Sequence, residues 1–228
     1  MHYDWNWDEA ARLFRKAIEL NPNLAAAHKW YAWFLTWVEA KYDAAIECYS
    51  VAEKLDPLPL DNWYLRGYTY YAAGDFDLAL GSFRAALELE PGFAQAHYGV
   101  GDVYNQQGRL DEAIVEFSQA VELGGRASNA VALLSYLYGL AGEPEKARPL
   151  IAELEQRSAE GYAADMWIAV GYAGLGEIDT MFDRLEAGFQ THDPVLAYIS
   201  RTHEFDPYRS DPRFHDLLVK MGLGHYNE

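Results

Sequence analysis

Apolar and small residues recur with a helical spacing in two segments that begin 34 residues apart. The first reads GDFDLALGSFRAALELEP from Gly74 to Pro91, and the second reads GRLDEAIVEFSQAVELGG from Gly108 to Gly125. In both, an alanine is followed four residues later by phenylalanine and three residues after that by another alanine. Residues three and four apart share one face of an α-helix, so each segment predicts one amphipathic helix.

The same pattern recurs at intervals of about 34 residues over most of the chain; this regular spacing is called the repeat frame. In each copy a small residue, a large apolar residue and a second small or apolar residue occupy the same three positions. These triplets are Ala10/Phe14/Ala17, Ala45/Tyr49/Ala52, Ala79/Phe83/Ala86, Ala113/Phe117/Ala120 and Ala147/Ile151/Leu154, with a weaker sixth copy at Met181/Leu185/Gly188. A fixed period of this length is the signature of a repeat protein.

Glycine and acidic residues precede these helices, as in GDFD, GRLD, GEPE and GEID. Glycine ends the previous helix in a left-handed conformation, and acidic residues favour the N-terminus of the next. Upstream of each turn lies another helical pattern with a small residue at its centre, for example Trp63, Gly67 and Tyr70. Each copy therefore predicts two antiparallel helices, and stacked copies form one continuous core.

These positions resemble the tetratricopeptide repeat, whose motif has tryptophan, glycine and an aromatic residue in the first helix, then alanine, phenylalanine, alanine and proline. The copy from Leu60 to Phe93 matches at Trp63, Gly67, Tyr70, Gly74, Ala79, Phe83, Ala86 and Pro91. The resemblance covers residues 8–195. It implies an all-α fold, a right-handed α-solenoid of stacked antiparallel helix pairs with C-terminal capping helices.

The frame divides the chain into a repeat array over residues 1–195 and a C-terminal helical cap and tail over residues 196–228. The array contains a half repeat at 8–24 and repeats at 25–59, 60–93, 94–127, 128–161 and 162–195. One extra residue near TWVEA in the repeat at 25–59 predicts a longer first helix or a looser turn. In the tail, Asp211 and Pro212 predict the cap and first position of a short terminal helix.

The tail AYISRTHEFDPYRSDPRFHDLLVKMGL resembles the ending of bacterial multidomain regulators. In those proteins a tetratricopeptide array follows a winged-helix DNA-binding domain, an adenylate cyclase domain or a protein kinase domain. The opening HYDWNWDEAARLFRKAIELNPN is similar to an internal segment of such arrays. The resemblance implies a piece or a shortened relative of a longer regulator, whose catalytic and DNA-binding activities do not carry over.

The helix predicted near residues 8–20 has no first helix before it in the repeat frame. Leu13 and Phe14 would then lie on an open end of the stack. Trp5 and Trp7 could fold over that end as a cap, or a second copy of the chain could pair with it. We favour pairing, which predicts a homodimer, because so short a segment covers only part of such a face.

Charge and composition restrict the classes of partner that the chain is expected to bind. The net charge is −17, from 35 acidic and 18 basic residues, and it opposes binding to nucleic acid or to an anionic membrane. The sequence contains no apolar run of membrane-spanning length and no signal peptide. The single cysteine, Cys48, excludes an intramolecular disulfide and fits a reducing compartment, so we expect a cytoplasmic location.

No residue pattern indicates catalysis, a metal site or a cofactor. The tail contains several metal-binding residue types, but without the H-E-x-x-H spacing of zinc hydrolases: His203, Glu204, Asp206, Asp211, His215 and Asp216. His28 and His97 occupy the tryptophan position of the motif, which favours packing. Cys48 has no adjacent histidine or lysine to lower the pKa of its thiol. We therefore predict that the protein is not an enzyme.

The resemblance also implies an inner groove lined by residues of the first helices. The candidate ligand-binding residues are Lys29, Trp33, Trp37, Tyr64, Tyr68, Tyr71, Tyr98, Asp102, Asn105 and Tyr136. Two interpretations stay open: these aromatic side chains pack in the core, or they form a recognition surface, for which tyrosine and tryptophan are well suited. On the second interpretation, Tyr68 and Tyr98 contact the ligand while Trp63 and Tyr70 hold the fold.

The predicted function is non-catalytic protein–protein interaction, as a scaffold that binds a peptide segment and is part of or related to a bacterial regulator. The family's clamp for a C-terminal carboxylate needs several basic residues, but Lys29 alone is basic among the candidates. We therefore expect a protein or peptide partner of apolar, proline-rich or basic character. The alternative is a non-protein ligand, such as a glycan or a small effector, in the same groove.

Overall fold

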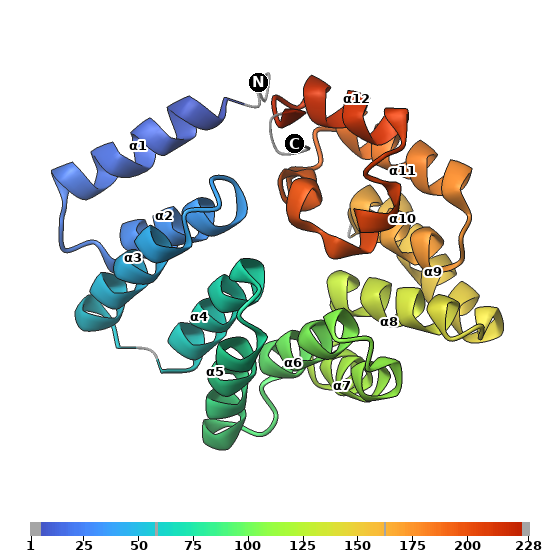
Figure 1. Ribbon diagram of the computed structural model, residues 1–228, viewed down its shortest axis with the longest axis horizontal. Coiled ribbons are helices and arrows are strands. Elements are labelled where there is room, and N and C mark those ends of the chain that lie inside the picture. The colour runs from blue at the N-terminus through green and yellow to red at the C-terminus, as the bar shows by residue number, and fades with distance from the viewer. Residues whose placement is uncertain (1–5, 58, 162, 225–228) are drawn as a thin grey trace. The chain divides into compact units, whose positions relative to one another are not determined.

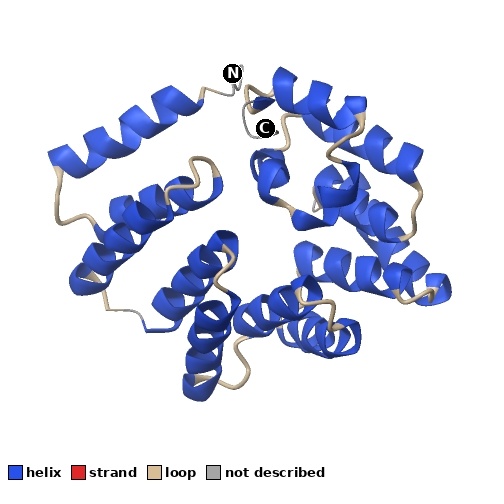
Figure 2. Cartoon of the chain, viewed as in Figure 1, coloured by secondary structure: helices blue, strands red, loops and turns tan. Residues whose placement is uncertain are grey.

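The computed structural model describes residues 6–57, 59–161 and 163–224. These residues form helices and no strand (Figure 2). In chain order the α-helices are α1 (Trp7–Leu20), α2 (Ala25–Trp37), α3 (Tyr42–Leu55), α4 (Pro59–Ala73), α5 (Phe76–Leu89), α6 (Ala94–Gln106), α7 (Leu110–Leu123), α8 (Ser128–Leu140), α9 (Pro144–Ala159), α10 (Asp165–Gly174), α11 (Ile178–Gln190) and α12 (Pro212–Lys220) (Figure 1). Two 3-10 helices, η1 (Pro194–Arg201) and η2 (His203–Tyr208), lie between α11 and α12. The prediction of an all-α helical-repeat solenoid is confirmed.

The chain separates into two compact units at a point within α6. The N-terminal unit ends at Val103 and contains α1 to α5 and most of α6. The C-terminal unit begins at Tyr104 and contains the end of α6, helices α7 to α12 and both 3-10 helices. Each unit has its own buried side chains.

Consecutive helices pack against each other within both units. In the N-terminal unit α2 packs on α3, α3 on α4 and α4 on α5; in the C-terminal unit α8 packs on α9, α10 on α11 and α8 on α10. The triplet residues of the predicted second helices are buried at every position from Ala45 to Gly188. The 34-residue pattern therefore marks the side chains that hold neighbouring helices together.

Small residues permit the closest helix contacts. A Cβ atom on Gly67 or on Gly99 would lie 2.5 Å from a ring carbon of Phe83, so both glycines make room for that ring. In the C-terminal unit α8 and α10 touch through their backbones. A Cβ atom on Gly139 would lie 2.4 Å from the carbonyl carbon of Gly174, and one on Gly174 would lie 2.4 Å from the carbonyl oxygen of Tyr136.

The extra residue of the repeat at 25–59 lies in a looser turn. Helices α2, α6 and α8 all have 13 residues, but the connection after α2 runs over residues 38–41, one residue more than 107–109 or 141–143. Ala40 takes a φ of 52° in this turn. The shorter turns place glycine in the left-handed region instead, with a φ of 71° at Gly108 and 73° at Gly142.

The expectation that Trp63 holds the fold is wrong. Its side chain is 38% exposed, whereas Tyr68, expected to face a ligand, is only 4% exposed. Trp63 lies in the second turn of α4, and Val51 and Leu55 in the last turns of the neighbouring α3 are exposed to a similar degree. The periodicity identified the correct helix, but it did not predict that more than a third of this side chain is exposed.

Helix α1 covers part of α2. Ala11 packs with Phe34 and Val38, and the ring of Phe14 lies 5.6 Å from that of Phe34. Phe14 therefore faces α2 and not an open end of the stack, which corrects one expectation. The side chain of Trp7 joins the same cluster, while Trp5 lies outside the described residues.

The outer side of α1 exposes Leu13 and Leu20. Pairing of two copies through the N-terminal end stays a prediction. These two leucines, and not Phe14, are the apolar side chains that such pairing would cover.

The C-terminal cap has the expected start. The side chain of Asp211 accepts a hydrogen bond of 2.9 Å from the backbone N–H of Arg213, and Pro212 is the first residue of α12. Phe205 from η2 and Phe214 from α12 are fully buried, with ring centroids 6.1 Å apart. The tail is therefore packed into the C-terminal unit.

Candidate functional site

Six of the ten candidate residues form one group of rings in the N-terminal unit. We call it the aromatic cluster: Trp33, Trp37, Tyr64, Tyr68, Tyr71 and Tyr98, from helices α2, α4 and α6. Tyr68 is its centre, with ring centroids at 5.0 Å for Tyr64, 5.9 Å for Tyr71, 6.0 Å for Trp37, 6.3 Å for Tyr98 and 6.4 Å for Trp33. Three helices that are successive first helices of the repeat frame thus meet around one ring.

A buried hydrogen bond fixes the centre of the cluster. The Tyr68 hydroxyl donates to Oδ2 of Asp102 at 2.9 Å, and both side chains are buried. Burial, and then the nearby Asp102 carboxylate, raise the pKa of Tyr68 well above its usual value. Tyr68 therefore stays a neutral donor, and it connects α4 to α6.

Exposure divides the candidates into two groups. Trp37, Tyr68 and Tyr71 are buried and contribute to packing, as the first of the two sequence interpretations proposed. Trp33, Tyr64 and Tyr98 are only partly buried, so part of each ring is exposed to solvent. Which of the ten residues bind a ligand stays a prediction, but these three rings are the accessible part of the aromatic cluster.

Lys29 lies on the first turns of α2 and is paired. Its ammonium nitrogen is 3.1 Å from Oδ2 of Asp61 on α4. The pair joins two successive first helices at the edge of the candidate surface. Because both partners are at least partly exposed, it contributes little to stability, but it neutralises the one basic residue among the candidates.

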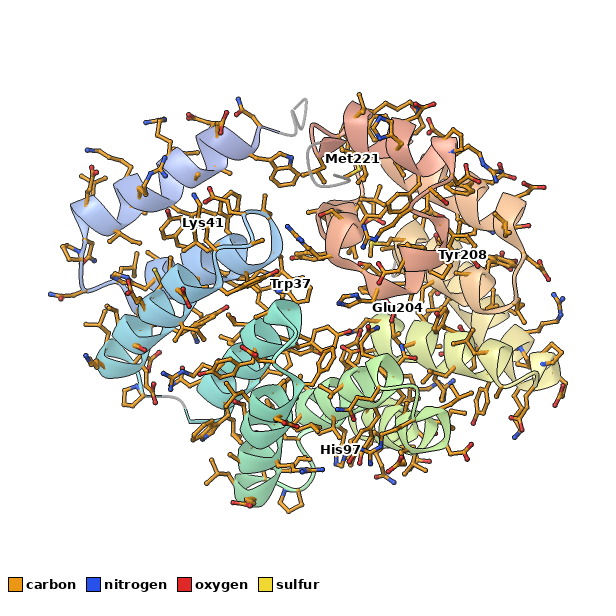
Figure 3. All side chains as sticks on the ribbon, in the orientation of Figure 1. Trp37, Lys41, His97, Glu204, Tyr208 and Met221 are labelled. Atoms are coloured by element: carbon orange, nitrogen blue, oxygen red, sulfur yellow. The ribbon has the colours of Figure 1, made fainter. Side chains whose placement is uncertain are left out.

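Asn105 and Tyr136 belong to the C-terminal unit, and both are affected by Glu204 of the tail. The Asn105 amide donates to Oε1 of Glu204 at 3.3 Å. Tyr136 is buried, and its pKa is raised by burial and then by the Glu204 carboxylate. Glu204 and Tyr208, labelled in Figure 3, both come from η2, and the Tyr208 hydroxyl donates to the carbonyl of Ala173 at 3.0 Å. Asn105 therefore already has an intramolecular partner, and Tyr136 lies within the electrostatic influence of the same carboxylate.

Glu204 is a residue whose role sequence reasoning missed. In the sequence, Glu204 is one of several acidic residues in the tail, but in the structure it is a buried carboxyl group. Burial is the main cause that raises the pKa of Glu204, and the hydrogen bond from Asn105 only partly opposes it. No local signal points to this contact, because the two residues lie 99 positions apart.

We expect Glu204→Gln to stabilise the protein at neutral pH. The carboxyl ionises at lower pH in the unfolded chain than in the folded one, so ionisation disfavours folding once the pH exceeds about 4.5, the ordinary glutamate value. Glutamine keeps the acceptor oxygen and carries no charge. The gain should be about 1–2 kcal/mol at pH 8 and should vanish near pH 4, measured as Tm across that range. A loss of stability that is the same at every pH would contradict this account.

The other titratable groups of interest have structural partners. His28 donates from Nε2 to the carbonyl of Pro22 at 2.9 Å, and His97 does the same to Pro91 at 3.0 Å. Each histidine thus fastens the start of a first helix to the preceding turn. Cys48 is half-buried, and burial followed by the charge of Glu47 raises the pKa of its thiol, which makes it a poor nucleophile.

The described residues contain no group of side chains suited to hold a metal ion. No three histidine, cysteine, aspartate or glutamate side chains come together in a group that could hold an ion. In the tail, Nδ1 of His203 lies 3.0 Å from Asp206, which Arg209 also contacts at 2.6 Å. In the same described part of the chain, every helix is too short or too polar to cross a lipid bilayer.

Comparison with known proteins agrees with the repeat architecture. The family model for the tetratricopeptide repeat matches residues 36–80 and 64–131, which together include α3 to α7. No curated protein sequence matches the chain. The matched segments carry most of the motif residues, from Ala45 to Ala120, on which the resemblance rests.

Solved structures share the fold at low sequence identity. A tetratricopeptide repeat protein from Parabacteroides merdae is 17% identical, with a TM-score of 0.60 over 95% of this chain and 78% of the other. A thermophilic tetratricopeptide repeat protein from Thermus thermophilus is 17% identical, with a TM-score of 0.58 over 88% and 98%. The Cut9–Hcn1 hetero-tetramer of the APC/C is 19% identical, with a TM-score of 0.60 over 94% of this chain and 39% of the other. These likenesses concern the helical solenoid alone.

Proposed function

We propose that this chain is a non-catalytic scaffold that binds a protein partner through Trp33, Tyr64 and Tyr98. The observation that carries the proposal is the arrangement of these three partly exposed rings around the buried Tyr68. Packing against Tyr68 restricts the rings before any ligand arrives, so little conformational entropy is lost on binding. Tyrosine and tryptophan also combine a large apolar area with a polar group, which suits binding hot spots.

The fold supports a protein partner. Helical solenoids present extended surfaces built from equivalent positions in successive repeats, and the aromatic cluster uses three such helices. One similar structure, the Cut9–Hcn1 hetero-tetramer, is itself a protein assembly. The resemblance of the tail to bacterial regulators favours a role inside such a regulator, where the array would bring a partner to another domain.

The charges near the cluster define the kind of partner. Asp102 accepts from Tyr68 and Asp61 is paired with Lys29, so the acidic groups at this surface have internal partners. The local contacts therefore favour apolar or proline-rich segments. The net charge of −17 adds a long-range preference for basic partners, which weakens as salt increases.

The proposal is tested with peptides selected from a phage-displayed library by the wild-type chain. We expect Trp33→Ala/Tyr98→Ala to weaken binding of the selected peptides at least tenfold, about 1.4 kcal/mol. The matched control is Trp30→Ala/Trp63→Ala, because both tryptophans are exposed on first helices that contribute to the cluster but lie outside the cluster itself.

Equal affinity of the wild type and the Trp33/Tyr98 variant would refute the proposal, as would an equal loss in the control. A failure to select peptides, together with glycan binding that the same variant abolishes, would support the alternative of a carbohydrate ligand. Aromatic rings also stack on sugars, so the two outcomes use the same variants and differ only in the ligand.

A further inference from the structure

A cavity of about 460 Å³ opens in the N-terminal unit where the connection between α2 and α3 meets the end of α4. Its volume falls within the range of roughly 300–1,000 Å³ that is usual for small-ligand sites. The side chains that matter for its chemistry are Lys41, Tyr42, Asp43, Thr69, Tyr70 and Asp75. None of them belongs to the aromatic cluster, so this cavity is a separate site.

Two carboxylates line the cavity without a partner among the described residues. Asp43 lies in the first turn of α3 and is exposed. Asp75 is the N-cap residue of α5, yet its side chain makes no capping hydrogen bond. An N-cap aspartate ordinarily accepts a bond from a backbone N–H of its own helix, so the free carboxylate of Asp75 is available to a ligand.

The one basic side chain of the cavity is already neutralised. The ammonium nitrogen of Lys41 lies 2.6 Å from Oε2 of Glu39, outside the cavity lining. Lys41 therefore does not cancel the charges of Asp43 and Asp75. The lining is acidic overall, and a group of opposite charge would gain from both carboxylates.

The remaining walls also favour a cation. The partly buried rings of Tyr42 and Tyr70 line the cavity, and aromatic faces attract ammonium and guanidinium groups. Residues Thr69 to Ala73 form the last turn of α4, and the C-terminal end of a helix carries a partial negative charge. The starts of α3 and α5 would favour an anion, but Asp43 and Asp75 stand at those starts and oppose it.

We propose that this cavity binds an organic cation, the guanidinium of an arginine or the ammonium of a lysine. The group is presented by a partner's side chain or belongs to a free small molecule. The two carboxylates supply charge-assisted hydrogen bonds, and the tyrosine rings cover the apolar stem. The proposal does not depend on the aromatic cluster, so it stands or falls separately from the function proposed above.

The test is a titration of the full chain with N-acetyl-arginine amide, followed by backbone amide NMR. We expect saturable shifts at Tyr42, Thr69, Tyr70 and Asp75, and none with N-acetyl-citrulline amide, which has the same shape without the charge. Agmatine provides the second arm: tighter binding of the blocked arginine than of agmatine indicates a protein side chain as ligand, whereas tighter binding of agmatine indicates a free cation.

Asp43→Asn/Asp75→Asn should weaken binding of the arginine derivative at least tenfold. The matched control is Glu47→Gln/Asp77→Asn, which removes the same charge from exposed positions on α3 and α5 outside the cavity. Equal shifts with citrulline, an equal loss in the control, or binding of inorganic phosphate at these residues in place of the cation would overturn the proposal.

Discussion

Phe83→Ala is expected to lower the free energy of unfolding of the N-terminal unit by about 3–5 kcal/mol, the usual cost of removing a large buried ring. Phe83 is fully buried, and its ring centroid lies 5.1 Å from that of Tyr68. Gly67 and Gly99 approach the ring from two other helices. The cavity left by alanine cannot be filled by these glycines, because they have no side chains that could move into it.

Urea denaturation followed by circular dichroism measures this cost, and Trp63→Ala is the matched control. Trp63 is the larger aromatic residue, but its side chain is 38% exposed. Its replacement should therefore cost less than that of Phe83, because a partly exposed site leaves no closed cavity. A larger loss for Trp63→Ala than for Phe83→Ala would mean that the indole, and not the ring of Phe83, is the central packing residue of this repeat.

Gly174→Ala should destabilise the C-terminal unit by about 3 kcal/mol, because the added methyl group overfills a closed contact. Its Cβ would lie 2.4 Å from the carbonyl oxygen of Tyr136 and 2.5 Å from the Cα atom of the same residue. Both are backbone atoms of α8, so no side-chain rotation relieves the overlap. The two helices must separate, and that separation disturbs packing along their whole contact.

Gly81→Ala is the control with the opposite expected sign. Gly81 is exposed within α5, and a Cβ atom built on it meets no atom within 4 Å. Alanine should stabilise this helix by about 0.5–1 kcal/mol because glycine loses more conformational freedom on folding. Thermal denaturation of both variants provides the comparison, and a neutral result for Gly174→Ala would show that α8 and α10 separate without cost.

The repeat frame predicted the core well because each repeat buries the same few positions. Ala79, Phe83 and Ala86 share one face of α5, and that face packs on neighbouring helices. Position along one helix is a local property, so a single sequence reveals it. The cap at Asp211 was predictable for the same reason, since its hydrogen bond spans only two residues.

The candidate site was harder to predict because exposure depends on the neighbouring repeats. Tyr68 and Tyr64 both lie on α4 and share the same residue type, yet one is buried and the other is partly open. The difference comes from rings and a carboxylate that α2 and α6 supply. The contact between Asn105 and Glu204 is an extreme case, because no pattern near either residue indicates the other.

The backbone contact between α8 and α10 also restricts motion. Exposed side chains change rotamer within nanoseconds, but two touching peptide backbones cannot adjust without displacement of a whole helix. Sliding of α8 against α10 at Gly139 and Gly174 therefore requires the two helices to separate. The 3-10 helices η1 and η2 are held differently, by buried side chains such as Phe205 and by the hydrogen bonds of Glu204 and Tyr208. Asn105 and Glu204 belong to this packed segment and its partner helix, so a ligand that bound Asn105 through its amide would compete with the hydrogen bond to Glu204.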